Sequence, residues 1–159
     1  MRPLLSLLCF LLLNFAVSAQ NPITYKLDLS QIQHHELKVN ITFNALSPEP
    51  LVVRMPTSSP GRYAEHNFSK NVYAVVAKDE AGNTLLVSRT GLNEWTVVQH
   101  KGKVHFSYTL YANRADGTYA KVDNLKLHLN MPATFAYGVG MEQRPVELII
   151  PKHQNWSVA

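Results

Sequence analysis

Apolar and polar residues alternate along several short segments of this sequence, and that alternation restricts the chain to β-structure. Every second residue is apolar in residues 23–29, 37–43 and 104–110. Successive side chains of a strand point to opposite faces of a sheet, so each segment predicts a strand with one buried face. Turn residues recur about every eight to twelve residues, and no amphipathic helix is indicated. We therefore expect an all-β fold, an antiparallel β-sandwich of about ten strands.

Further segments complete the set of expected strands. They are residues 51–55, 72–77, 84–89, 95–97, 125–129, 135–137 and 146–150. We expect the two alternating segments nearest the N-terminus to pair as an antiparallel hairpin. Residues 72–77 are apolar on both faces, which predicts a central strand.

Residues 56–72 interrupt the strand pattern. Pro56 and Pro60 each lack a backbone donor and push the preceding residue towards extended geometry, so neither a regular helix nor a central strand can run through them. Pro60 and Gly61 form a turn dipeptide, and residues 62–70 have the length of about two helical turns, of which we expect at most a short turn to form. Because long connections in β-domains commonly carry function, we interpret this proline loop as a functional or interface segment.

Residues 1–19 have the features of a secretory signal peptide. Arg2 supplies the positive charge, residues 4–13 are apolar, and Val17-Ser18-Ala19 precedes the expected cleavage site. Apolar residues continue beyond Cys9, which disfavours a lipoprotein anchor there, and the apolar segment is too short for a preferred membrane span. We expect export to the periplasm or the medium, no membrane attachment after cleavage, and one mature domain, residues 20–159.

Charge and cysteine content argue against several classes of protein. The net charge of +4 at pH 7 is spread over single Lys and Arg residues, so no nucleic-acid partner is expected. The only cysteine lies in the leader, so the mature domain must be held by its core. Asn-x-Ser/Thr triplets begin at Asn40, Asn67 and Asn155, and we interpret them as ordinary polar positions.

The residue patterns of common catalytic and metal sites are missing. No pair of histidines four residues apart flanks a glutamate, as a helical zinc site would require. His34 and His35 are adjacent and point apart, whereas His105 and His128 fall on outward faces. Solvated histidine is the favoured interpretation, with cross-strand metal binding the alternative. We expect no catalytic residue, no cofactor and no metal in this chain.

Several short motifs follow one another in a distinctive order. They are Met55-Pro56, Pro60-Gly61-Arg62-Tyr63, Asn71-Val72, Trp95, Tyr108-Thr109-Leu110-Tyr111-Ala112, then Asp123, His128 and Asn130, and finally residues 137–145 and 151–159. This order resembles the N-terminal domain of the glycyl aminopeptidase family of zinc metallopeptidases. The resemblance covers nearly all of residues 20–159.

The resemblance implies a β-sandwich that precedes a thermolysin-like catalytic domain, whose histidine-glutamate-x-x-histidine helix binds zinc. None of that catalytic domain lies within these residues, so we expect the chain alone to be inactive and interpret it as a truncated or partial product. The expected partner is the catalytic domain in cis, and peptide substrate is expected only together with it. Candidate interface residues are Pro60, Gly61, Arg62, Tyr63, Tyr137 and Arg144.

One motif suggests contact with substrate. Residues 139–143 are similar to the glycine-alanine-methionine-glutamate-asparagine strand of another aminopeptidase group, whose glutamate binds the substrate amine. Met141 and Glu142 are the identical positions. Glu142 is therefore a candidate for binding a substrate ammonium group, and a surface ion pair with Arg144 is the alternative.

A second hypothesis comes from a different class of protein. The chain is then a free-standing secreted binding or adhesion module that uses exposed aromatic side chains. Tyr63, Tyr111, Tyr119 and Trp156 are the candidates. A stable isolated monomer favours this hypothesis, whereas a large exposed apolar face favours docking on another domain.

Overall fold

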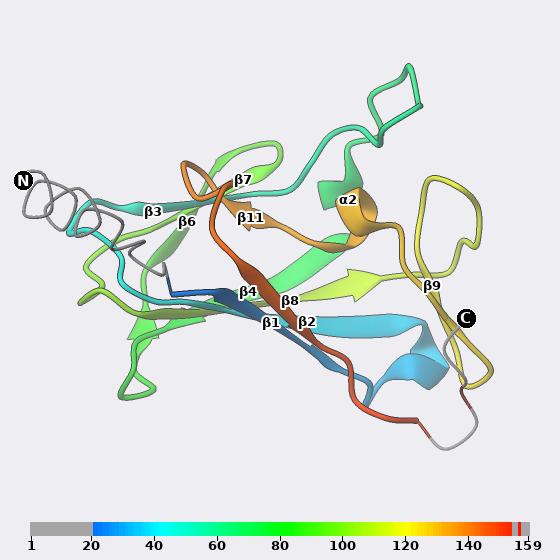
Figure 1. Cartoon of the computed structure of the whole chain (residues 1–159), viewed down its shortest axis with the longest axis horizontal. Helices are drawn as coiled ribbons and strands as arrows, with labels where there is room; N and C mark the ends of the chain where they lie inside the picture. Colours follow the sequence, from blue (N-terminus) through cyan, green and yellow to red (C-terminus); the bar gives the residue numbers. More distant parts are fainter. Residues whose placement is uncertain (1–20, 154–155, 157–159) are drawn as a thin grey trace, which may run out of the picture.

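The computed structural model describes residues 21–153 and 156, and it is a sandwich of two main β-sheets (Figure 1). The larger sheet has the strand order β12-β1-β2-β8-β4-β5, and the smaller has the order β11-β3-β7-β6. The strands of the larger sheet are β1 (Ile23–Asp28), β2 (Glu36–Phe43), β4 (Val72–Lys78), β5 (Thr84–Leu85), β8 (Val104–Tyr111) and β12 (Val146–Ile149). Those of the smaller are β3 (Leu51–Arg54), β6 (Val87–Gly91), β7 (Glu94–Val97) and β11 (Tyr137–Gly138). The expected all-β sandwich is confirmed.

Within the part of the chain that the structure describes, little regular structure lies outside these two sheets. A small ladder pairs β9 (Lys121–Val122) with β10 (Leu127–His128). The helical segments are η2 (Ile32–His34), η3 (Phe68–Asn71) and α2 (Met131–Thr134), each a single turn. Among the described residues, no helix has the length and apolarity needed to cross a lipid bilayer.

Alternating residues of β2 and β8 form the centre of the core. Leu37, Val39, Ile41 and Phe43 of β2 oppose Leu110, Tyr108, Phe106 and Val104 of β8, and all eight are buried. Trp95 and Val97 of β7, and Met55 directly after β3, belong to the same core. Because one residue of slip would turn every apolar side chain towards water, this pattern sets the register of the pair. The expected hairpin of β1 and β2 is also confirmed.

Two tyrosines of the larger sheet hold the backbone that follows α2. The Tyr108 hydroxyl donates to the carbonyl of Thr134 at 2.6 Å and accepts from the amide of Ala136 at 3.0 Å. The Tyr25 hydroxyl donates to the carbonyl of Ala136 at 2.9 Å. Burial raises the pKa of Tyr108 and raises that of Tyr25 to about 12, so both stay protonated donors at neutral pH.

The strand expected at residues 72–77 is β4, which lies between β8 and β5 in the larger sheet, but its two faces are not both buried. Only Val72 and Ala77 of β4 are buried, and Tyr73 is 41% exposed. The register of β4 on β8 shifts between Tyr73 and Val76, where Ala74 has a φ of 50°. Such a bulge breaks the simple alternation of side chains. The neighbouring strand, β5, is also too short to cover β4 along its length.

Residues 84–89 do not form one strand as expected. The chain leaves the larger sheet after β5 and enters the smaller sheet at β6, so it changes layers near Leu86. A short segment predicted as one strand can therefore supply strands to both layers of a sandwich.

The sheet is also not purely antiparallel, because β12 pairs with β1 in the parallel direction. Of residues 125–129, which were predicted to form a strand, only Leu127 and His128 do so, as β10. There, the Asp123 carboxylate accepts from the amides of Leu125 and Lys126 at 2.8 and 2.9 Å. This Asx turn occupies the backbone donors and leaves Leu125 83% exposed.

Replacing Tyr108 with Phe should show how much the hydroxyl contributes. Two buried backbone groups would lose their partner, so we expect the free energy of unfolding to fall by about 2–4 kcal/mol, measured by urea denaturation. Tyr111→Phe, at the exposed end of the same strand, should change it by less than about 0.5 kcal/mol. An equal loss in both variants would contradict this role of Tyr108.

Candidate functional site

The proline loop projects from one end of the sandwich, between β3 and η3 (Figure 1). Its tip is exposed, with Gly61 at a φ of 76° and the Tyr63 side chain fully open to solvent. Its base is fixed, because Ser59 is buried and the amide of His66 donates to the carbonyl of Thr57 at 2.7 Å. The only helical part among residues 56–72 is η3, in agreement with the expected short helical turn.

Asn130 joins three segments at this end of the molecule. Its side-chain oxygen caps α2 by accepting from the amide of Ala133 at 3.3 Å. Its amide nitrogen donates to the carbonyl of Gly117 at 3.1 Å and lies 3.3 Å from the Ser59 hydroxyl. One side chain thus connects the proline loop, α2 and residues 113–120, and we call this assembly the loop end.

The tip of the proline loop lies against residues 113–120. The Arg62 guanidinium occupies the space where a Cβ at Gly117 would be, so a larger residue at this position would displace Arg62. The rings of His66, Phe68 and Tyr119 form one cluster, in which the ring centroid of His66 lies 5.4 Å from that of Phe68 and 5.8 Å from that of Tyr119. The loop end is therefore a packed surface and not a set of independent loops.

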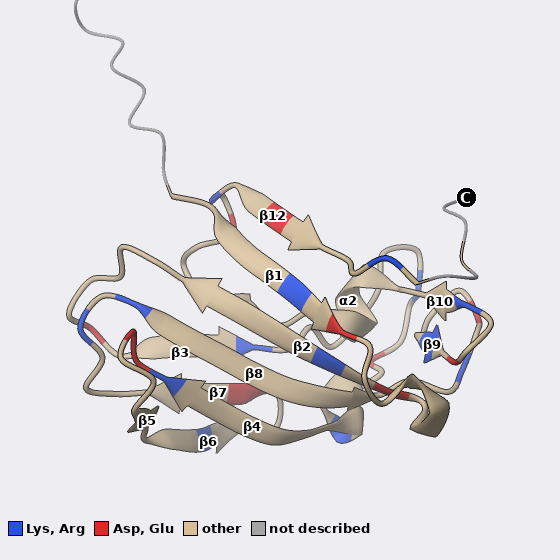
Figure 2. Ribbon diagram, turned by 90° about the horizontal axis from the view of Figure 1, so that it is seen from below, with Lys and Arg blue, Asp and Glu red and all other residues tan. Residues whose placement is uncertain are grey.

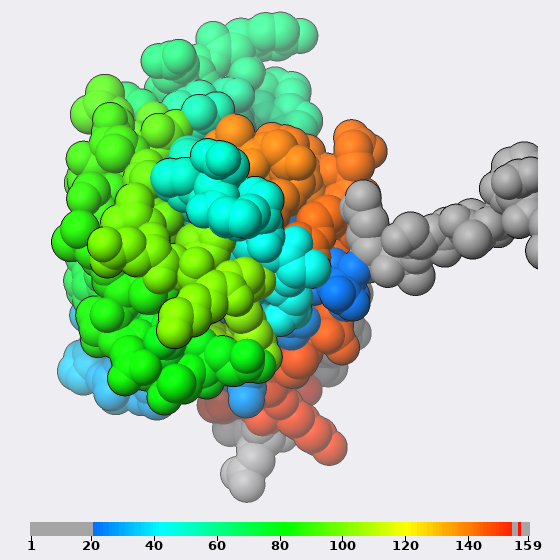
Figure 3. All heavy atoms as spheres, turned by 90° about the vertical axis from the view of Figure 1, so that its left-hand side faces the viewer, coloured from blue at the N-terminus to red at the C-terminus, as the bar shows by residue number. Residues whose placement is uncertain are grey.

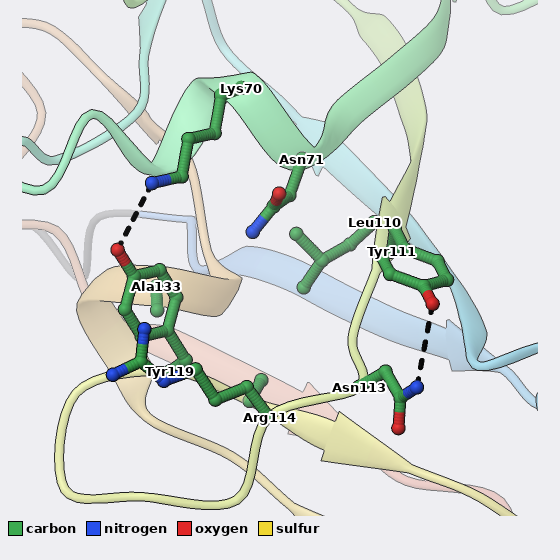
Figure 4. Close-up of a pocket in the computed structure, with 9 residues that line it drawn as sticks. Lys70, Asn71, Leu110, Tyr111, Asn113, Arg114, Tyr119 and Ala133 are labelled. Atoms are coloured by element: carbon green, nitrogen blue, oxygen red, sulfur yellow. Dashed lines mark hydrogen bonds between the residues drawn. The ribbon is translucent and has the colours of Figure 1, made fainter.

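A polar pocket of about 280 Å³ opens at the loop end. It is lined by Lys70, Asn71, Leu110, Tyr111, Asn113, Arg114, Tyr119, Ala120 and Ala133 (Figure 4). Lys70 donates to the Tyr119 hydroxyl at 3.2 Å, and the guanidinium of Arg114 lies 4.6 Å from the centre of the same ring. Cationic and amide side chains therefore gather around one aromatic ring.

Tyr137 and Glu142 lie on a different surface, around β11 and the turn after it. Tyr137 pairs with Arg54 of β3, whose guanidinium binds Glu94 at 2.6 Å. The exposed Glu142 carboxylate accepts from the amide of Gly140 at 3.1 Å. Hydrogen bonds from the backbone amides of Glu142 and Gly140, together with the charge of Arg54, lower the pKa of Glu142.

Arg144 does not pair with Glu142, which was the alternative interpretation of these two residues. Its guanidinium donates to the carbonyl of Asn44 at 2.8 Å and to that of Asn21 at 3.1 Å. These bonds fasten the turn before β12 to the end of β2 and to the start of the described chain. Arg144 therefore has a structural role, the fastening of this turn, that the sequence did not indicate.

The proline loop and Arg144, which supply five of the six candidate interface residues, lie at opposite ends of the sandwich. Arg144 lies near Phe43, which pairs with Val104 at the start of β8, whereas Lys70 of η3 lies near Tyr111 at the end of β8. Eight strand residues separate the two ends, or about 25 Å.

Figure 3 shows the end remote from the proline loop, where the turn of residues 79–83 adjoins residues 100–103 and Lys103 binds Glu80 at 2.9 Å.

The histidines are mostly bound to backbone or neighbouring polar groups. The ring of His105 lies 3.1 Å from the Thr42 hydroxyl, and that of His128 lies 2.9 Å from the carbonyl of Asp116. His35 and His100 contact the carbonyls of Val122 and Glu49. Within residues 21–153 and 156, no three or more His, Cys, Asp or Glu side chains form a group that could hold a metal ion.

Basic and acidic residues are scattered over the face shown in Figure 2. Lys26, Lys38 and Lys78 occur singly on β1, β2 and β4. The loop end is different, because there Lys70 and Arg114 share one pocket. The sequence did not identify this pair, since the two residues lie far apart in the chain and only the fold brings them together.

Comparison with known proteins identifies the family to which this domain belongs. Residues 24–159 match the family described as the peptidase M61 N-terminal domain. The chain belongs to this family. The sequence motifs predicted the N-terminal domain of a peptidase, and this match confirms that prediction. No curated protein matches the chain.

A solved structure supports the fold of the domain. It is the crystal structure of an aminopeptidase N family protein from Idiomarina loihiensis, with a TM-score of 0.77 and 23% sequence identity. The match covers 84% of this chain and 22% of that protein. The chain thus spans about a fifth of the length of this structural relative.

Asn130→Ala tests whether this residue holds the loop end together. We expect the free energy of unfolding to fall by about 1–2 kcal/mol because α2 loses its cap. We also expect faster hydrogen exchange at the amides of Arg62 and His66, which close turns in the proline loop. Asn130→Asp keeps the capping oxygen but not the donor to Gly117, so it should retain α2 and still loosen the loop. Unchanged exchange in both variants would refute the connection.

Proposed function

We propose that this chain is the N-terminal β-domain of an exported zinc aminopeptidase similar to the glycyl aminopeptidases. In this proposal the domain packs on a catalytic domain in cis and helps to form the cleft that receives a peptide. The family match over residues 24–159 carries the proposal, because the family is defined as the N-terminal domain of a peptidase. Zinc and the residues that activate water are assigned to the catalytic domain, since the described residues offer no group that suits a metal.

An apolar groove offers a surface for this packing. It holds about 200 Å³ and is lined by Tyr25, Met131, Phe135, Val146 and Leu148, between β12 and α2. Val146 is 62% exposed and Met131 56%. The neighbouring Ile149 and Ile150 extend the exposed apolar surface along the edge strand. Apolar surface of this kind is a common site of contact between domains.

The sequence-derived interface residues have different parts in this proposal. Pro60, Gly61, Arg62 and Tyr63 form the exposed tip of the proline loop, which can reach a neighbouring domain. Tyr137 lies beside Arg54 at the surface of the smaller sheet, whereas the guanidinium of Arg144 is already occupied by backbone carbonyls. We therefore place docking at the β12–α2 groove and at the tip of the proline loop.

Glu142 remains the proposed contact for a substrate amine. Its carboxylate is exposed and ionised, as an ammonium ligand would require. The carboxylate accepts from the amide of Gly140, and the guanidinium of Arg54 is bound to Glu94, so an ammonium group would bind Glu142 alongside the Gly140 amide.

The full-length product of the gene, read beyond residue 159, provides the test. We expect it to contain a zinc-binding helix and to release N-terminal glycine from peptides in a chelator-sensitive reaction, whereas residues 20–159 alone stay inactive. A gene that stops without a zinc motif would remove the peptidase proposal. A stable, monomeric, secreted domain from such a gene would instead favour the free-standing binding module.

Met131→Asp in that full-length protein tests the groove. A charge at a buried domain contact costs several kcal/mol, so we expect separate unfolding transitions for the two domains and a roughly tenfold lower kcat/KM. Leu125→Asp, at an exposed position outside the groove, serves as the matched control and should leave both properties unchanged. Equal behaviour of the two variants would exclude docking at this groove.

A further inference from the structure

The pocket at the loop end has more hydrogen-bond donors than the protein itself uses. The Tyr119 hydroxyl accepts from Lys70 and the Tyr111 hydroxyl accepts from Asn113 at 3.4 Å, which leaves both hydroxyl hydrogens able to donate. These are the two hydrogen bonds drawn among the pocket residues in Figure 4, where the Asn71 amide points into the space between the two tyrosines. An acceptor entering this space would meet donors from several directions.

Of the side chains that line the pocket, Lys70 and Arg114 are charged, and only Lys70 has no acidic partner among the described residues. Arg114 binds Asp116 at 2.6 Å, so most of its charge is balanced. Burial opposes ionisation of Asp116, but hydrogen bonds from the amides of Thr118 and Tyr119, with the charge of Arg114, lower its pKa and keep it anionic. Lys70 lies 5.3 Å from the centre of the Tyr119 ring, and no carboxylate of the described residues forms an ion pair with it.

We propose that this pocket binds a carboxylate group of a peptide. In the bound state the carboxylate lies beside Lys70 and the Tyr119 hydroxyl, and accepts from the Asn71 amide. Charge-assisted hydrogen bonds to an ammonium group are among the stronger polar contacts in proteins. The proposal concerns residues of this chain alone and does not rest on the proposed peptidase function.

The charge of the pocket and its apolar floor favour a carboxylate over a phosphate. One uncompensated cation matches a monoanion, whereas a phosphate monoester carries nearly two negative charges at neutral pH. The apolar floor formed by Leu110, Ala120 and Ala133 suits the methylene groups that carry a carboxylate, as in a glutamate side chain or a chain terminus.

The probes are three N-acetylated tetrapeptides and inorganic phosphate. Each is titrated into the full chain, and binding is measured by calorimetry and NMR. The peptides are acetyl-Gly-Ala-Glu-Ala-amide, acetyl-Gly-Ala-Gln-Ala with a free C-terminus, and the neutral acetyl-Gly-Ala-Gln-Ala-amide. We expect binding of at least one of the two charged peptides, weakened by added salt, and none of the neutral peptide. The two charged peptides distinguish a side-chain carboxylate from a terminal one.

Variants of the pocket complete the test. Lys70→Met should weaken carboxylate binding about tenfold, because one charge-assisted hydrogen bond is lost. Asp116→Asn keeps an acceptor for the local amides and releases the charge of Arg114, so it should tighten binding about threefold. Lys78→Met, on the exposed side of β4 and away from the pocket, is the matched control and should have no effect.

Several results would overturn the proposal. They are equal binding of the neutral peptide, tighter binding of phosphate than of either charged peptide, absence of binding by both charged peptides, and equal affinities of Lys70→Met and Lys78→Met. An inactive full-length protein that still binds the charged peptides would refute the peptidase function and leave the pocket intact.

Discussion

The loop end depends on the buried hydroxyl of Tyr108, which ties the backbone after α2 to the centre of the larger sheet. Because that hydroxyl both donates to Thr134 and accepts from Ala136, the short helix has a fixed position although it is only one turn long. An isolated turn of helix would not persist in water, so tertiary contacts must hold it. The position of α2 in turn places Asn130, which binds Gly117 and contacts Ser59.

Two surfaces of different chemistry meet at α2. Ala133 lines the polar pocket, and Met131 lines the apolar groove beside β12. The pocket gathers donors and one uncompensated cation, whereas the groove exposes aliphatic and aromatic side chains. The hydrogen bonds of Tyr108 and Tyr25 to Thr134 and Ala136 thus hold the one helix that separates the proposed carboxylate pocket from the proposed docking groove.

The strands that could be predicted best are those with one buried face. Alternation located β1, β2 and β8, since every second side chain of these strands enters the core. It misjudged β4, whose bulge and near-edge position expose residues that composition alone would bury. It also missed the change of layer near Leu86 and the parallel pairing of β12 with β1, because neither leaves a local pattern in the sequence.

The sequence by itself determined the fold class, the irregular character of the proline loop and the family, because these follow from local periodicity, proline geometry and short ordered motifs. Only the tertiary structure decided which side chains share a site. Lys70, Arg114 and Tyr119 become neighbours through the packing of η3 against residues 113–120, and Arg144 meets the backbone carbonyls of Asn21 and Asn44. Contacts between residues distant in sequence depend on how the sheets stack, which no single segment encodes.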